Sequence, residues 1–236
     1  MERSLAEHGY WCGRLFFASE VVMLLWFVAD NFAKRVKRLL LPPEIEREVL
    51  IAGPFNYAKT HHLLKHSEIW PLAERCFTEL QVASVQNIFA KKLPWQFDIS
   101  AEDTHIDKVV WRLVRPGYPE DVGPVHADQW FWDANEWKVP EGKRPLKLWA
   151  MIGDGDSGLS VAPGSHRKKW NFDVEHRHGK LKPIFDPKDH GVRMVPLVVP
   201  AGHGVIFDHN LLHGGLPCPP YNPCRVSIEA TLLIRE

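Results

Sequence analysis

The second half of the chain constrains the fold most. From about residue 108 onward, short runs rich in β-branched and aromatic residues alternate with turns that contain Pro or Gly. These runs cover residues 108–117, 123–132, 145–153, 158–166, 192–202, 204–215 and 224–235. Short strands separated by such turns are typical of an all-β sandwich or barrel. We therefore expect residues 105–236 to form a β core.

Residues 1–100 have a different pattern, in which apolar side chains recur at helical spacing. In the segment 41–50, Pro43 comes early and acidic residues follow it, which is typical of the start of a helix. A further helix is predicted over 70–92. We expect this helical part and the β core to form a single domain over residues 1–236.

The segment 15–29, LFFASEVVMLLWFVA, is almost wholly apolar, and the basic cluster KRVKR follows at 34–38. It is too short to span a bilayer, which needs about 20 apolar residues. Two interpretations remain open: a buried helix whose last turn carries cations that favour the helix dipole, or a helix lying on an anionic membrane surface. We expect a cytoplasmic protein in the first case and peripheral association with the inner face of a membrane in the second.

The charge balance argues against one class of partner. The formal net charge is zero and the pI is about 7.2, so no basic excess indicates binding to nucleic acid. The four cysteines show neither a C-x-x-C pair nor zinc-finger spacing. A reduced, cytosolic state is the simplest interpretation of these cysteines.

A His-x-acid triplet occurs at His66-Ser67-Glu68, at His105-Ile106-Asp107 and at His126-Ala127-Asp128. Residues two apart on a strand project from the same side, so such a pair can present two ligands to one metal ion. A further histidine would complete the two-His, one-carboxylate site of non-haem Fe(II) oxygenases. With 13 His and 29 acidic residues, the chain should contain such triplets by chance, so the triplet alone selects nothing.

Candidates for the rest of such a site follow along the chain. His213 ends a β-rich run in NLLHGG, and the two glycines after it would allow the backbone to approach a metal closely. Arg225 lies on the next predicted strand and would give the distal carboxylate of 2-oxoglutarate a planar, bidentate partner. Ser227 points the same way, being two residues on. The alternative interpretation of this strand is an exposed polar face.

Five pieces of sequence match a known family when they are read in order: RLVRPG, VHAD, LKLWAMIGDGDSGLSVAPGSH, AGHGVIFDHNLLHGG and CRVS. Together they make residues 109–233 resemble the phytanoyl-CoA dioxygenase family of Fe(II)/2-oxoglutarate oxygenases. The string GLSVAPGSH at 158–166, with Ser160 and Ala162 at its variable positions, is distinctive of that family. The resemblance implies a double-stranded β-helix, which is a cupin-like jelly roll, with helices on its N-terminal side.

The resemblance also implies a reaction. Fe(II) and 2-oxoglutarate would be the cofactors, O₂ would be consumed, 2-oxoglutarate would be decarboxylated to succinate, and an aliphatic C–H bond would be hydroxylated. Halogenation is not expected, because it requires the carboxylate ligand to be replaced and Asp128 is present. The alternative is a non-catalytic, cupin-like binding module, which loss of a ligand or of Arg225 would indicate; neither is lost.

The resemblance implies iron binding by His126, Asp128 and His213, 2-oxoglutarate binding by Arg225, Ser227 and Trp149, and a place near the active-site mouth for His166. Order along the chain also separates the rival triplets. The pair at 126 and 128 follows RLVRPG as in the family, whereas His105 precedes that piece. His66 falls in the helical pattern, where residues i and i+2 diverge.

Substrate contacts are predicted from position and charge. Trp130 and Trp132, on the same predicted strand as the ligand pair, would wall the pocket. Arg112 and Lys147 would belong to a basic rim for an anionic substrate, with His166 beside it.

The substrate itself is predicted by combining this rim with the apolar and basic segments at 15–29 and 34–38. A lipid-linked sugar acid such as the Kdo of lipopolysaccharide fits both. A soluble small carboxylic acid or a natural-product intermediate is the alternative, and Ala127, in place of a Gln that is frequent in the namesake enzyme, argues against that enzyme's own substrate. The polar stretch 165–191 is expected to be a surface loop or lid.

Overall fold

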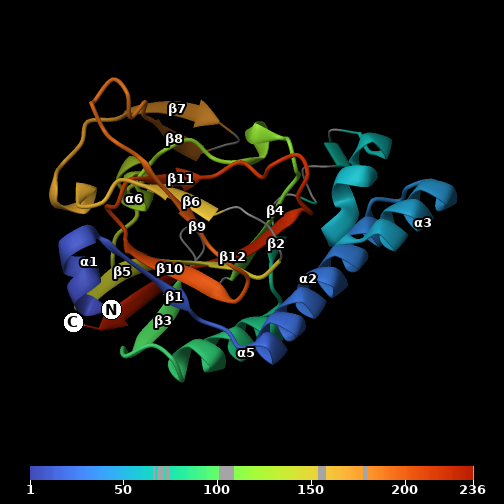
Figure 1. Cartoon of the computed structure of the whole chain (residues 1–236), viewed down its shortest axis with the longest axis horizontal. Coiled ribbons are helices and arrows are strands. Elements are labelled where there is room, and N and C mark those ends of the chain that lie inside the picture. The colour runs from blue at the N-terminus through green and yellow to red at the C-terminus, as the bar shows by residue number, and fades with distance from the viewer. Residues whose placement is uncertain are drawn as a thin grey trace.

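In the computed structural model, two β-sheets face each other and helices cover the outer side of the larger sheet (Figure 1). The structure describes residues 1–65, 67, 68, 72, 75–100, 109–153, 158–177 and 180–235. The predicted mainly β fold with N-terminal helices is confirmed. Two predicted triplets cannot be located in the fold, because His66, His105 and Asp107 lie outside the described residues.

The larger sheet has seven strands in the order β1-β10-β5-β12-β4-β2, and β3 also pairs with β12. Its strands are β1 (Tyr10–Arg14), β2 (Arg75–Cys76), β3 (Phe97–Ser100), β4 (Val110–Val114), β5 (Lys143–Met151), β10 (His203–Asp208) and β12 (Arg225–Arg235). The smaller sheet has the order β11-β6-β9 and consists of β6 (Gly158–Val161), β9 (Val195–Val198) and β11 (His213–Gly215). These pairings are antiparallel.

Among the described residues, helices with defined bounds are α1 (Glu2–His8), α2 (Ala18–Arg38), α3 (Pro43–Ala52), α5 (Glu79–Ala90) and α6 (Asp128–Ala134). Short 3-10 turns occur at η1 (Pro54–Lys59), η2 (His61–Leu63), η3 (Pro119–Asp121) and η4 (Ser165–Arg167). Helix α3 confirms the helix predicted over 41–50. Helix α5 accounts for the second half of the helix predicted over 70–92, whereas residues 75–76 form a strand and several residues of 70–74 lie outside the described residues.

The apolar segment 15–29 lies mostly within α2, which is an amphipathic helix packed on the sheet. Leu24 and Val28 share a buried cluster with Val85 of α5 and with Ile228 of the larger sheet. One face of α2 is therefore buried, as the first interpretation predicts. The opposite face leaves Trp26 64% exposed. Within the described ranges, no helix combines the length and the hydropathy needed to cross a bilayer.

A buried polar contact fastens α2 to α5. The Asn31 side-chain amide donates hydrogen bonds of 2.8 Å to the Phe27 carbonyl oxygen and to Oε1 of Gln81. Asn31→Leu removes one donor to the Gln81 oxygen, which keeps the Thr78 N–H at 3.0 Å, so we expect a loss of about 0.5–1.5 kcal/mol in the free energy of unfolding. Urea denaturation measures it. Asn87→Leu, on the exposed side of α5, is the matched control, and equal losses in both variants would contradict the prediction.

Two predicted segments differ from the structure. Residues 123–132 are not a strand: Ala127 is extended and caps α6, and Asp128 is the first residue of that helix. The reason is tertiary, because the Gln129 N–H donates to the His209 carbonyl oxygen at 2.9 Å and so holds the start of the helix. The stretch 165–191 is not simply a loop, because it contains η4 and an antiparallel hairpin of β7 (Asp173–Arg177) and β8 (Lys180–Ile184).

Candidate active site

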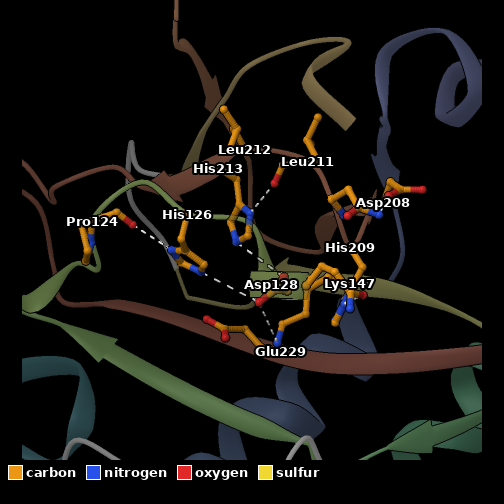
Figure 2. Close-up of polar contacts among 12 residues, drawn as sticks. Pro124, His126, Asp128, Lys147, Asp208, His209, Leu211, Leu212, His213 and Glu229 are labelled. Carbon is orange, nitrogen blue, oxygen red and sulfur yellow. Dashed lines mark hydrogen bonds and ion pairs between the residues drawn. The ribbon is translucent and has the colours of Figure 1, made fainter. Parts of the chain in front are cut away.

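Three predicted ligands meet between the two sheets at the start of α6. One ligand atom from each of His126, Asp128 and His213 lies within 4.8 Å of the others. The Nε2 atoms of the two histidines are 3.9 Å and 3.7 Å from the two carboxylate oxygens of Asp128. Figure 2 shows both imidazoles and the carboxylate pointing toward one another. The structure thus assembles a two-His, one-carboxylate cluster.

Backbone pairing places the two histidines side by side. His126 and His213 form an isolated antiparallel bridge in which each N–H donates to the other's carbonyl oxygen, at 2.9 Å and 2.8 Å. Asp128 follows two residues later, at the N-terminus of α6. His126 lies in the antiparallel bridge and Asp128 is the first residue of α6, whereas the sequence predicted both residues on one strand.

The second ring nitrogen of each histidine is fixed by a carbonyl oxygen. His126 Nδ1 lies 2.8 Å from the Pro124 oxygen, and His213 Nδ1 lies 3.0 Å from the Leu211 oxygen (Figure 2). A carbonyl only accepts, so each Nδ1 carries the proton and donates it. In the neutral form of each ring, Nε2 then has its lone pair directed at the centre of the cluster, which is how metal-binding histidines are oriented.

The charges at the cluster suit a divalent cation. Burial, followed by the nearby His213, lowers the pKa of His126 to about 4, so its imidazole is neutral at pH 7. Burial works to raise the pKa of Asp128, but the charge of Lys147 and the neighbouring imidazoles hold it below its usual range. Asp128 is therefore an ionised, buried carboxylate. Its Oδ2 has no hydrogen-bond partner among the described residues, as expected of a buried oxygen that binds a metal ion.

A buried cation lies beside this cluster on β12. Arg225 is 3% exposed and donates to the carbonyl oxygens of Gly158 and Leu216 at 3.1 Å and 2.8 Å. Burial lowers the pKa of Arg225 to about 10, against the opposing charge of Glu229, so the guanidinium stays charged at pH 7. A Cβ on Gly215, two residues after His213, would lie 3.7 Å from Arg225 Nη2.

Ser227 and Trp149 complete this corner. Ser227 is fully buried, and its hydroxyl has no hydrogen-bond partner among the residues that the structure describes. The Trp149 ring centroid lies 5.8 Å from the Arg225 guanidinium carbon. A buried cation with an unsatisfied hydroxyl nearby fits a carboxylate ligand. The exposed-face interpretation of this strand is wrong, since Arg225 and Ser227 are both buried.

The sequence profile of the phytanoyl-CoA dioxygenase (PhyH) family matches residues 101–218. The chain belongs to the phytanoyl-CoA dioxygenase family. The predicted enzyme class, an Fe(II)/2-oxoglutarate-dependent dioxygenase, and the predicted cofactors are thereby confirmed. A non-catalytic binding module is not supported. No curated protein matches the sequence at a significant level.

Solved structures share the fold of this phytanoyl-CoA dioxygenase family member. EctD from S. alaskensis in its apoform matches with a TM-score of 0.61 and 15% identity, covering 98% of this chain and 75% of that chain. EctD from S. alaskensis with 2-oxoglutarate and 5-hydroxyectoine matches with a TM-score of 0.55 and 18% identity, covering 98% of this chain and 74% of that chain. EvdO2 from Micromonospora carbonacea var. aurantiaca matches with a TM-score of 0.53 and 15% identity, covering 99% of this chain and 90% of that chain. At these identities the likeness establishes the jelly-roll fold alone.

The basic residues predicted for the substrate rim have different surroundings in this family member. Lys147 is not on a rim: its Nζ lies 3.6 Å from Asp128 Oδ1 and its side chain is 12% exposed. Arg112 is half exposed and pairs with Glu229, with 2.6 Å between Nε and Oε1. His166 packs against the N-terminal segment, where a Cβ on Gly9 would lie 2.4 Å from its Nδ1.

The two predicted pocket tryptophans lie on α6, and both are buried. Trp130 stacks on Phe172 with ring centroids 4.6 Å apart, in an apolar cluster that includes Phe185. Trp132 meets the ring of His209 edge-on at 5.2 Å. His209 lies four residues before His213, and the described cluster of metal-type ligands does not include it. The carbonyls that orient the histidine rings were not predicted, because no sequence pattern marks them.

Proposed function

We propose that His126, Asp128 and His213 bind Fe(II), and that the chain hydroxylates an aliphatic C–H bond of an anionic substrate. The observation that carries this is the buried carboxylate of Asp128, which faces the Nε2 atoms of His126 and His213 and has one oxygen without a hydrogen-bond partner among the described residues. When bound, Fe(II) with 2-oxoglutarate supplies the oxidation by O₂, which yields succinate, CO₂ and the hydroxylated product.

The protein residues divide the remaining tasks. Arg225 and Ser227 would hold the distal carboxylate of 2-oxoglutarate, and Trp149 would close the space beside it. Burial of this corner keeps water away and strengthens the charge pairing. The proposal also treats residues 1–236 as a single domain. Its support is the apolar cluster that α2, α5 and the larger sheet share.

Exposed cations near the site support an anionic substrate. The Leu212 N–H, next to His213, donates to the Ser165 hydroxyl at 2.9 Å, which fastens η4 to the ligand strand. Arg167, Lys168 and Lys169 are exposed on and directly after this turn. A substrate bearing a carboxylate or phosphate would be attracted to this side of the site.

We propose a lipid-linked sugar acid, such as the Kdo of lipopolysaccharide, as the substrate class. Coupled succinate formation in a screen of lipid-linked sugar acids and soluble carboxylic acids tests this. Turnover of the lipid-linked class is the expected result. If only a soluble acid or a natural-product intermediate is turned over, the proposed hydroxylation stands and the proposal of a lipid-linked substrate is wrong.

A patch at the α2–α3 end of the molecule supports action at a membrane. Figure 1 shows α2 running past the sheets to α3 at the edge of the molecule. Leu40 is 89% exposed and has φ 51°, a left-handed conformation that is costly for a residue with a Cβ. Ile51 is 75% exposed beside a groove of about 530 Å³ that is lined by Leu41, Pro43, Glu46, Arg47, Leu50 and Ile51.

Charge makes an anionic lipid surface the occupant that we propose for this patch. Lys37 and Arg38 are exposed three and two residues before Leu40, and Arg47 is exposed one helical turn before Ile51, on a helix that also exposes Glu44 and Glu48. Apolar side chains flanked by cations are the combination that binds anionic bilayers.

Vesicle sedimentation tests the patch. The protein should pellet with vesicles of phosphatidylcholine and phosphatidylglycerol but not with phosphatidylcholine alone. Burial of one such side chain contributes about 1.5–3 kcal/mol, so the double variant Leu40→Asp, Ile51→Asp should weaken binding at least about tenfold. Leu80→Asp, at an exposed position of α5, is the matched control. Undiminished pelleting of the double variant would overturn the proposal, as would a self-association in solution that this variant abolishes.

A further inference from the structure

The two oxygens of Asp128 have different surroundings. Oδ1 lies 3.6 Å from Lys147 Nζ and 3.9 Å from His126 Nε2. Oδ2 lies 3.7 Å from His213 Nε2 and has no hydrogen-bond partner among the described residues. Figure 2 shows Lys147 reaching the carboxylate from the side away from His213. One oxygen thus faces a cation of the protein, and the other does not.

The sheet holds Lys147 in this position. Lys147 lies on β5, between Phe207 of β10 and Thr231 of β12, so its backbone is fixed by strands on both sides. It projects from the same face of β5 as Trp149, which lines the space between the sheets. Its side chain is only 12% exposed, whereas lysines are almost never buried without a charge partner.

The neighbouring carboxylate, that of Glu229, already has a close cation. Arg112 Nε lies 2.6 Å from Glu229 Oε1 across the β4–β12 pairing. Lys147 Nζ lies 3.6 Å from the other carboxylate at this site, at Oδ1 of Asp128.

We propose that Lys147 is a positioning residue that holds Oδ1 of Asp128, so that Oδ2 alone is offered to the metal. This inference rests on the proposed iron site. A carboxylate that binds through one oxygen occupies one position and leaves the face opposite the triad open for co-substrate and O₂. Partners that orient metal ligands in this way typically change metal affinity or activity 10- to 100-fold.

Metal titration without co-substrate or substrate tests the proposal. Co(II) is titrated by calorimetry into the metal-free protein, and the visible spectrum of the Co(II) form reports the ligand arrangement. We expect Lys147→Met to weaken Co(II) binding about 10- to 100-fold and to alter the spectrum. Lys147→Arg, which keeps the cation, should restore affinity to within a few fold. Should Lys147→Met fail to unfold cooperatively, Lys147→Gln, which lacks the charge but keeps a donor, takes its place with the same expected loss.

Lys143→Met is the matched control. Lys143 lies on the same strand and pairs with Asp98, but it belongs to the far end of β5, about 13 Å along the strand at 3.3 Å per residue. The Lys143→Met variant should bind Co(II) with the same affinity as the unmodified protein and show the same visible spectrum.

The outcomes separate this inference from the proposed function. If the unmodified protein binds no Co(II), or binds it equally well after His213→Ala, the metal site itself is wrong. If Co(II) binds through His213 but Lys147→Met leaves affinity and spectrum unchanged, or tightens binding, Lys147 does not position Asp128. A rise confined to the KM for the organic substrate would make Lys147 a substrate contact and would equally overturn the inference.

Discussion

His213→Ala should reduce kcat/KM for 2-oxoglutarate-dependent hydroxylation about 10³-fold or more. The side chain supplies one of the two imidazoles in the described cluster. Loss of an outer partner of a metal ligand already costs 10- to 100-fold, so loss of a ligand itself should cost more. Succinate formation and Fe(II) binding should fail together, and both are measured on the same preparation.

His203→Ala is the control for that variant. His203 begins β10, in the same stretch of sequence, and its Nδ1 lies 3.4 Å from the Ala201 carbonyl oxygen. It contacts none of the three clustered residues in the structure as described, so activity should stay within about twofold, as for most surface substitutions. Retention of full activity by His213→Ala would show that the iron site lies elsewhere.

Strand β12 shows why most of the β core was predictable. Its residues alternate between polar and apolar types from Arg225 onward, and this period of two identifies a strand without tertiary information. Alternation did not tell which face meets solvent. Both faces are buried, Val226 and Ile228 against the helix side and Ser227 between the sheets. Knowledge of the second sheet was needed to see that the polar face is an interior one.

Around Asp128 the local pattern favours the wrong structure. Trp130, Phe131 and Trp132 have high strand propensity, so residues 123–132 read as a strand. A contact with His209, distant in sequence, starts a helix instead. His126 and Asp128 nevertheless lie close to His213, because an extended residue and the first residue of a helix can still face one point.

Contacts between distant segments account for what the sequence did not predict. Strand β1 has no strong alternation and exists because Tyr10–Arg14 pairs with β10. Lys147 was placed on a solvent rim by its charge, but the pairing of β5 with β10 and β12 turns it toward Asp128. Propensity carries no information about such pairings, which depend on the whole assembled sheet.

Arg225→Gln should raise the KM for 2-oxoglutarate about 30- to 150-fold while leaving metal affinity almost unchanged. Hydrogen bonds to charged groups contribute roughly 1.5–3 kcal/mol, and a neutral amide loses both the charge and the planar fork, which places the effect near 2–3 kcal/mol. Glutamine keeps a donor for the Leu216 and Gly158 carbonyls, which limits damage to the fold. Steady-state kinetics at varied 2-oxoglutarate, with Co(II) titration of the same variant, measure the two properties separately.

The opposite end of the same strand provides the comparison. Arg235 is the last residue of β12 and is exposed, so Arg235→Gln changes the same side chain away from the site and should leave the KM as it was. The separation of effects is decisive. If Arg225→Gln weakened Co(II) binding as strongly as 2-oxoglutarate binding, the variant would be disturbing the cluster as a whole, and the assignment of Arg225 to the co-substrate would fail. A rise in the KM for 2-oxoglutarate alone, with Co(II) affinity kept, is the result expected of a carboxylate anchor beside Ser227 and Trp149.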